Sequence, residues 1–271
     1  MTRTDPRGGS GCDRSGLALR STGWSLRRCE EGKRYGLRRL VAALAVMSVA
    51  FAAGCGSNAG EDAYTPAVEA TRFVDTVDNS CFPLRPGTTY IYEGVSEEGA
   101  ERVETAVTSD TRKVMGVPTV VVWDRVWLEG ELIEETYDWY AQDQDGNVWY
   151  FGEDSRSYEG GSLVSTEGSW EAGIDGALPG IVMEAQPVVG HIYRQEYCKG
   201  EAEDMAEVLS TNASADVPYG AFTGCVQTRE WTPLASGQEE HKYYAHGVGT
   251  VLEVTVKGGT GTVKLVNIVA A

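Results

Sequence analysis

From Pro86 onward, the chain is a succession of short alternating polar and apolar stretches separated by closely spaced turn signals. Residues 88–92, 102–108 and 251–256 alternate with a period of two, the pattern of a strand with one buried face. Residues 119–123 form an uninterrupted apolar run, as expected for a strand covered on both faces. Good helical periodicity is nearly absent, and Gly, Pro and Asp-Gly steps divide the runs. We therefore predict an all-β body built as an antiparallel meander.

The second half of this body echoes the first. The segment around Tyr90 reappears around Tyr193, at an offset of 103 positions. Three further matches have an offset of 104: Gly116 with Gly220, Glu135 with Glu239, and Tyr140-Ala141 with Tyr244-Ala245. Such self-similarity predicts two pseudo-repeated halves, residues 84–153 and 187–268, joined by an insertion over residues 154–186. Two meanders of this kind can pack as a sandwich or form an open barrel.

An apolar segment near the N-terminus, Leu40–Ala53, is flanked by paired arginines on one side and by Gly-Cys on the other. Its 14 residues fall short of the roughly 20 that a permanent transmembrane helix needs. A basic flank, a short apolar run and small residues before a cut site are typical of a secretory signal peptide. The ending Ala52–Cys55 resembles the lipobox that lipoprotein signal peptidase cleaves. This resemblance implies that Cys55 carries a lipid.

These features predict a signal peptide over residues 1–54, a lipidated Cys55 that begins a flexible tether over residues 55–80, and the β body over residues 81–271. We expect the protein in the cell envelope, on the extracytoplasmic side and anchored to the membrane through the lipid. The basic residues before the apolar segment leave both the general and the twin-arginine export routes open.

The charge is divided unevenly. Residues 1–54 carry a net charge of +6, whereas residues 55–271 carry −23. Nucleic-acid binding draws on clustered Lys and Arg, so this composition argues against a nucleic-acid partner. It also argues against attachment to anionic lipids through charge. We therefore expect membrane contact only through the lipid on Cys55.

Three cysteines follow Cys55 in the chain, namely Cys81, Cys198 and Cys225. An exported protein meets oxidising conditions, which allow one disulfide and leave one thiol. We predict the pair Cys198–Cys225, because both residues lie in the second half of the body. No spacing of Cys and His suits a zinc site.

The segment Asp143–Asn147 alternates oxygen-bearing side chains and invites comparison with a calcium loop. The EF-hand loop needs Gly at position six and Glu at position twelve, whereas here Gly146 is fourth and Asp154 is twelfth. We interpret the segment as a hairpin turn. Since a Gly-rich phosphate loop and a GxSxG elbow are also absent from the sequence, we predict no metal and no cofactor.

Aromatic residues flank this turn, and a second aromatic pair lies at the equivalent place in the other half. Because neighbours in a strand face opposite sides, about half of them should be core and the rest could form a binding surface. The leading hypothesis is a non-enzymatic domain that binds a small molecule, glycan, lipid or envelope partner on these residues. The candidate ligand-binding residues are Trp139, Tyr140, Trp149, Tyr150, Tyr243 and Tyr244.

Two alternatives remain open. Glu134, Glu135 and Asp138 could supply the two carboxylates that glycoside hydrolysis requires, which would make the protein an envelope glycan hydrolase. The body could also be a purely structural spacer.

Residues 138–153, 168–173 and 242–249 resemble signature stretches of an uncharacterised family of bacterial secreted proteins and lipoproteins. The likeness extends over residues 82–268. It implies a single exported β body, and it implies no catalytic residue, because no activity is assigned to the family.

Overall fold

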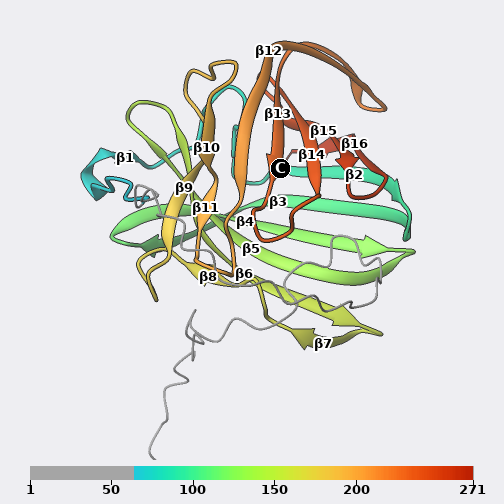
Figure 1. Cartoon of the computed structure of the whole chain (residues 1–271), viewed down its shortest axis with the longest axis horizontal. Helices are drawn as coiled ribbons and strands as arrows, with labels where there is room; N and C mark the ends of the chain where they lie inside the picture. Colours follow the sequence, from blue (N-terminus) through green and yellow to red (C-terminus); the bar gives the residue numbers. More distant parts are fainter. Residues whose placement is uncertain (1–63, 271) are drawn as a thin grey trace, which may run out of the picture.

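The computed structural model describes residues 64–270, so the predicted signal peptide and Cys55 lie outside the described residues. The described chain forms one antiparallel sheet of 16 strands (Figure 1). The first half contains the 3₁₀ turn η2 (Ala70–Arg72) and the strands β1 (Phe73–Val74), β2 (Thr89–Ser96), β3 (Gly99–Val114), β4 (Val117–Leu128), β5 (Glu131–Asp143), β6 (Val148–Glu159), β7 (Ser162–Ser165) and β8 (Trp170–Glu171). The second half contains β9 (Leu178–Met183), β10 (Ile192–Arg194), β11 (Glu196–Tyr197), β12 (Met205–Val217), β13 (Gly220–Trp231), β14 (Glu239–Ala245), β15 (Gly249–Lys257) and β16 (Gly261–Val269).

The two edges of the sheet meet in one short piece of chain. The strand order runs β10-β12-β13-β14-β15-β16-β2-β3-β4-β5-β6-β9-β11, so β10 and β11 are at opposite ends. These two strands follow each other directly, with only Gln195 between them. The sheet is thereby bent into a nearly closed barrel. This confirms the predicted all-β meander, and of the two predicted arrangements the barrel is the one observed.

The proposed repeat maps onto this order in a regular way. Tyr90 and Tyr193 lie in β2 and β10, and Tyr140 and Tyr244 lie in β5 and β14. Between these points, β3 and β4 of the first half correspond to β12 and β13 of the second. Each half therefore occupies consecutive positions in the sheet. The duplication stays a prediction.

The side chains that face inward change in character along the strands, and this change divides the barrel interior into two zones. In β4, Val120 and Val122 face inward and are buried, and the next inward positions are Asp124 and Val126. In β14 the inward positions change from the buried Tyr244 to Lys242 and Glu240. One end of the barrel is therefore filled by an apolar core, whereas the other end is polar. The core includes Val77, Cys81, Leu84, Tyr90, Val107, Val120, Val122, Val148, Met183, Ala206, Val208, Cys225, Val226 and Leu265.

A second apolar cluster lies outside this core, where Trp139 of β5 and Phe151 of β6 pack with Trp170. Residues 64–80 also pack onto the body. The Tyr64 hydroxyl donates to the Pro179 carbonyl at 2.9 Å, and the Phe73 ring lies edge-on to Phe151. The predicted tether over residues 55–80 is thus wrong for its described part. Its mostly small and polar composition concealed a few apolar anchors.

Two further predictions need correction. The predicted disulfide does not form in the described part of the chain: Cys225 belongs to the inner core and Cys198 to the outer cluster, and the two are not bonded to each other. Position in the sequence could not show this separation. The predicted insertion over residues 154–186 is largely part of the sheet, because it contains the end of β6 together with β7, β8 and β9.

Candidate functional site: a carboxylate-lined cavity

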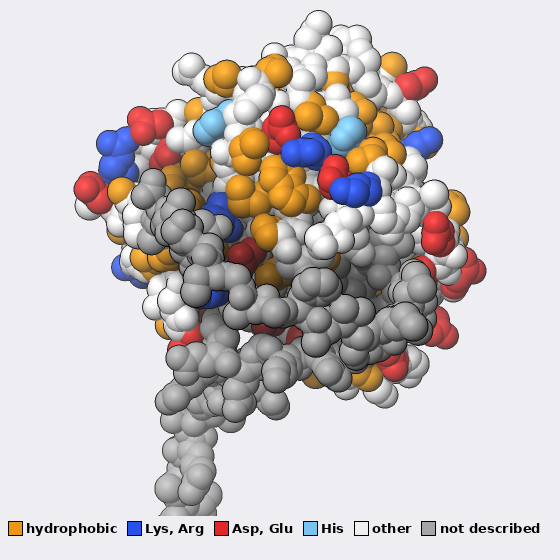
Figure 2. Space-filling view, viewed as in Figure 1, with side chains coloured by type: hydrophobic (Ala, Val, Ile, Leu, Met, Phe, Trp, Pro, Cys, Tyr) orange, Lys and Arg blue, Asp and Glu red, His pale blue; other side chains and the backbone are white. Residues whose placement is uncertain are grey.

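The polar end of the barrel encloses a cavity of about 520 Å³. Its mouth lies among the turn between β2 and β3, the turn between β15 and β16, and the start of β14. Figure 2 shows Asp and Glu side chains gathered along the right-hand edge of the view, the side on which β2 lies in Figure 1.

Acidic side chains dominate the lining. Twelve carboxylates line the cavity, against two lysines. Most of the carboxylates come from strands, and Glu98 and Asp204 come from the loops that precede β3 and β12. The carboxylates are Glu98, Glu101, Asp124, Glu134, Asp138, Glu153, Glu196, Asp204, Glu230, Glu239, Glu240 and Glu253, and the lysines are Lys242 and Lys257.

The six aromatic candidates divide equally between the two faces of the sheet. Tyr140, Tyr150 and Tyr244 line the cavity. The other three candidates do not, because each is a sequence neighbour of one of these tyrosines and points the opposite way. They are Trp139, Trp149 and Tyr243.

Two of the inward tyrosines donate hydrogen bonds to carboxylates. The Tyr150 hydroxyl donates to Asp138 Oδ1 at 2.6 Å, and the Tyr244 hydroxyl donates to Glu230 Oε1 at 2.7 Å. The rings of Tyr140 and Tyr150 stack with centroids 4.9 Å apart. Burial, followed by nearby carboxylates, raises the pKa of all three tyrosines well above the usual value. They are therefore fixed, neutral hydrogen-bonding groups and ring surfaces.

The outward aromatic residues have structural partners of their own. The Arg112 guanidinium lies 4.0 Å from the centre of the Trp139 ring, and Trp149 Nε1 donates to Asp143 at 2.8 Å. The Tyr243 hydroxyl accepts from Gln227 at 3.0 Å. These contacts place the three side chains in the packing of the outer face.

The deepest carboxyl groups have perturbed acidities. Burial, then the charge of Asp138, raises the pKa of Glu153 well above its usual value. Burial, then the charge of Asp204, also raises the pKa of Glu196 well above its usual value. A hydrogen bond that Trp170 Nε1 donates to the Glu196 carboxylate at 3.0 Å opposes this shift. Crowded carboxyls in a partly desolvated space tend to retain protons that exposed carboxyls would lose.

Both lysines of the lining are already engaged with a carboxylate. Lys242 Nζ lies 3.1 Å from Glu230, in the deeper part of the cavity. Lys257 Nζ lies 2.9 Å from Glu239, near the mouth. Each lysine therefore forms an ion pair with one glutamate of the lining.

The three acids considered for glycan hydrolysis do not lie together. Glu134 and Asp138 line the cavity, but Glu135 does not. The Glu135 carboxylate accepts one hydrogen bond from Trp123 Nε1 at 2.9 Å and another from the Tyr158 hydroxyl at 3.0 Å. The inward neighbour of Asp138 is Glu153, which pairs with it across β5 and β6.

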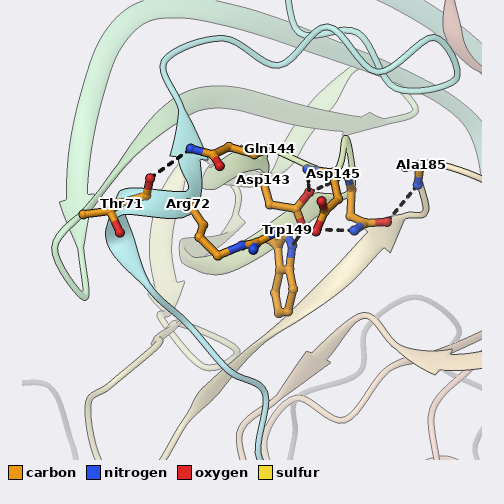
Figure 3. A network of polar contacts seen from close by, with 8 residues as sticks. Thr71, Arg72, Asp143, Gln144, Asp145, Trp149 and Ala185 are labelled. Carbon is orange, nitrogen blue, oxygen red and sulfur yellow. Dashed lines mark hydrogen bonds and ion pairs between the residues drawn. The ribbon is translucent and has the colours of Figure 1, made fainter.

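The Asp143–Asn147 segment is a turn between β5 and β6 (Figure 3). The Asp143 carboxylate accepts from the backbone amides of Asp145 and Asn147, each at 2.9 Å, and also from the side chains of Asn147 and Trp149. Asp145 forms an ion pair with Arg72. Within residues 64–270, no group of three or more His, Cys, Asp or Glu residues could hold a metal ion.

The sequence reasoning missed Glu153, Gln195, Glu196 and Asp204, which all line the cavity. Tyr150 and Glu153 are three residues apart and should face opposite sides, but a β-bulge shifts the register between them. Gly152 lies in this bulge with a φ of 131°, against the backbone of Trp170. Gln195 and Asp204 lie outside the strands at the barrel seam, and Glu196 belongs to β11, which has only two residues, so no periodic signal exists there.

Comparisons with known proteins leave the family open. No protein-family profile and no curated protein sequence matches the chain. Among solved structures, a protein of Bacteroides fragilis described as a candidate exported protein with a YmcC-like fold has 14% identity and a TM-score of 0.42, covering 69% of this chain and 98% of its own. A candidate lipoprotein of Parabacteroides distasonis has 11% identity and a TM-score of 0.39, covering 69% and 97%. Both similarities are distant, so the function has to be inferred from the residues of this protein.

The fold and the site define a class: an antiparallel barrel with one filled end and one carboxylate-lined hollow end. No helix in the described part of the chain is long and apolar enough to span a membrane.

Proposed function

We propose that this protein is an exported, lipid-anchored binding protein that holds a small ligand in the polar end of its barrel. The observation that carries the proposal is the cavity itself, into which polar groups and tyrosines from many strands converge. Binding sites are typically concave, with apolar and aromatic walls and a few well-placed polar groups. A solid spacer would have no need of a cavity lined with buried ionisable groups, whose desolvation costs stability.

The proposed location rests on the segment that ends at Cys55. Cleavage there would leave an acylated cysteine as the first residue of the mature protein. Mass spectrometry of the protein purified from its native membrane should find this N-terminus, and Cys55→Ala should move the protein out of the membrane fraction. An unmodified Cys55 in a cytosolic protein would overturn this part of the proposal.

The proposed binding is tested by melting the full-length protein with a panel of amines, sugars and lipids. A ligand of the native state must raise the melting temperature. Tyr150→Phe removes the hydroxyl that binds Asp138 inside the cavity, so it should reduce the effect of the active ligand. Tyr243→Phe is the matched control on the outer face and should leave the effect unchanged. If no member of the panel stabilises the protein, or both variants respond alike, the structural spacer becomes the better explanation.

A glycan hydrolase is the second candidate, favoured by the pairing of Asp138 and Glu153 across neighbouring strands. A carboxyl with a raised pKa can act as a general acid, and a neighbouring carboxylate can assist it. Incubation of the protein with envelope glycans, followed by mass analysis, would reveal cleavage products. Under the binding proposal no products form. Products that vanish in Glu153→Gln would favour the hydrolase.

A further inference from the structure

The outer face of the barrel carries a group of exposed apolar side chains where the chain enters the seam. Val188 and Val189 lie in the turn before β10, and Ile192 is the first residue of that strand. They are 63%, 59% and 49% exposed, and we call these three residues the seam patch. Ile192 points outward, because its neighbour Tyr193 is buried in the inner core. Figure 2 shows hydrophobic side chains over the upper and central part of the view, where β10 and β12 lie in Figure 1.

The turn itself does not require apolar side chains. The Val188 carbonyl accepts from the His191 amide at 2.9 Å, and the Gly190 amide donates to the Val208 carbonyl at 2.8 Å. These are backbone contacts, and turns favour Gly, Pro, Asn, Asp and Ser. Grouped apolar side chains that face water mark a surface that contacts another molecule or a membrane.

The acidic side chains beside the seam patch are engaged with basic groups. The Glu184 carboxylate lies 2.6 Å from His191 Nδ1. Glu207 is the cross-strand neighbour of Ile192, and its carboxylate lies 2.8 Å from the Arg229 guanidinium. Although the body as a whole is acidic, these contacts reduce the negative charge next to the seam patch.

An arginine and two tyrosines continue the same outer face. Arg194 lies two residues beyond Ile192, and its guanidinium is 5.7 Å from the centre of the Tyr64 ring and 4.7 Å from that of Tyr197. Within residues 64–270, Arg194 forms no ion pair with a carboxylate. Tyrosine and arginine combine an apolar body with a polar end, and both are suited to the boundary between lipid and water.

The chain limits how far this face can lie from the proposed lipid anchor. The Tyr64 hydroxyl holds the start of the described chain to the Pro179 carbonyl. Nine residue steps lead from Cys55 to Tyr64, and fully extended they span at most about 32 Å. A domain of this length is about 40 Å across. The side of the body that carries Tyr64 and Arg194 is therefore the side that a lipid on Cys55 keeps near the membrane.

We propose that this outer face rests on the membrane, with the seam patch inserted among the lipid headgroups and Arg194 beside the lipid phosphates. The inference rests on the anchoring at Cys55 in the proposed function, and it adds a second contact with the same membrane. The contact depends mainly on apolar side chains. It is therefore compatible with an acidic body, whose composition opposes attachment through charge.

The test places an environment-sensitive dye on the acylated full-length protein in phosphatidylcholine vesicles. Val189→Cys provides the attachment site. Leu163→Cys is the matched control, because Leu163 is an apolar residue of β7 that is 54% exposed, and β7 lies far from β10 in Figure 1. The unmodified protein is the labelling blank, since Cys81, Cys198 and Cys225 are buried.

Phosphatidylcholine with a quenching group near its headgroup should remove at least half of the fluorescence from position 189 and leave that from position 163 unchanged. Adding Ile192→Asp to the Val189→Cys protein should at least halve this quenching, because a charged side chain is unfavourable in lipid.

The outcomes separate this inference from the anchoring at Cys55. If the protein floats with the vesicles but position 189 is not quenched, or both positions are quenched alike, the proposed contact is wrong and the anchoring stands. Self-quenching between dyes at position 189 without quenching by lipid would show that the seam patch pairs with a second copy, which also overturns the proposal. If the protein does not float with the vesicles, both the anchoring and the contact fall.

Discussion

Glu196 is a carboxyl group that folding places in an unfavourable environment. It is 7% exposed, and burial and neighbouring acids raise its pKa. Its folded-state pKa therefore lies above the unfolded value, near 4.5. Between these two values the folded protein holds a proton that the unfolded chain has lost, so this group lowers stability as the pH rises.

Glu196→Gln should remove this penalty while keeping an oxygen that can accept from Trp170. We expect the variant to be more stable than the unmodified protein at pH 7.5, by about 1.4 kcal/mol for each pKa unit relieved. This gain corresponds to a rise in melting temperature of roughly 3–5 °C. The difference should shrink as the pH falls toward 4.5. Melting curves from pH 4.5 to 8 check the prediction, and a difference that grows toward low pH would contradict it.

Asp143 has the opposite role, because its carboxylate accepts hydrogen bonds that stabilise the folded chain. Its buried carboxylate receives four hydrogen bonds that shape the turn between β5 and β6. Asp143→Ala should lower the free energy of unfolding by about 2–4 kcal/mol, because several donors lose a charged acceptor. Asp145→Ala removes only a largely exposed ion pair with Arg72 and should cost less than about 1 kcal/mol. Urea unfolding measures the free energy of unfolding of both variants. An equal decrease in the two variants would show that the turn does not depend on Asp143.

At the scale of the elements, the closure of the barrel depends on a close approach between β9 and the chain from β10 to β11. A Cβ atom on Gly180 would lie 2.3 Å from the Gln195 carbonyl carbon and 2.6 Å from the Arg194 carbonyl oxygen. Both are backbone atoms, so a side-chain rotation cannot relieve the clash. Glycine at this position lets the seam form and places the Gln195 side chain in the cavity.

Gly180→Ala should therefore open the seam and cost about 3 kcal/mol of unfolding free energy, at the upper end for overpacking. Gly220→Ala is a suitable control. Its added Cβ would meet only the Phe222 ring, at 3.9 Å, and the change should be neutral or slightly stabilising. Denaturant unfolding of the two variants compares them directly. A Gly180→Ala protein as stable as Gly220→Ala would show that the seam is loosely packed.

The elements also show how far the sequence could predict this structure. Alternation and turn residues were sufficient for the strand character of β2, β3, β5, β6 and β15, and alternation separated Tyr140 from Trp139. Alternation predicts the wrong face for Glu153. The β-bulge before Glu153 adds one residue to β6, and this residue reverses the side of the sheet to which the following side chains point. The alternation pattern gives no prediction for Gln195 and Glu196, because their positions depend on closure of the barrel by distant strands.

At the scale of the whole molecule, no local pattern distinguishes a sandwich from a barrel. The choice depends on whether the first and last edges of the sheet meet, and here β10 and β11 bring them together. The cavity is a consequence of this closure, since its carboxylates come from strands that are far apart in sequence. The composition shows that the body is acidic, but it cannot show that many of the acidic side chains face the inside of the barrel.

The most direct test of a binding site inside the barrel is a titration of tyrosine-labelled full-length protein, followed by aromatic NMR, with the member of the amine, sugar and lipid panel that raises the melting temperature most. Resonances assigned by single Tyr→Phe variants distinguish the inward Tyr140, Tyr150 and Tyr244 from the outward Tyr243. We predict that the three inward resonances shift together and saturate, whereas the Tyr243 resonance stays in place. Shifts confined to Tyr243 and other outward tyrosines, with the inward three unchanged, would contradict the account.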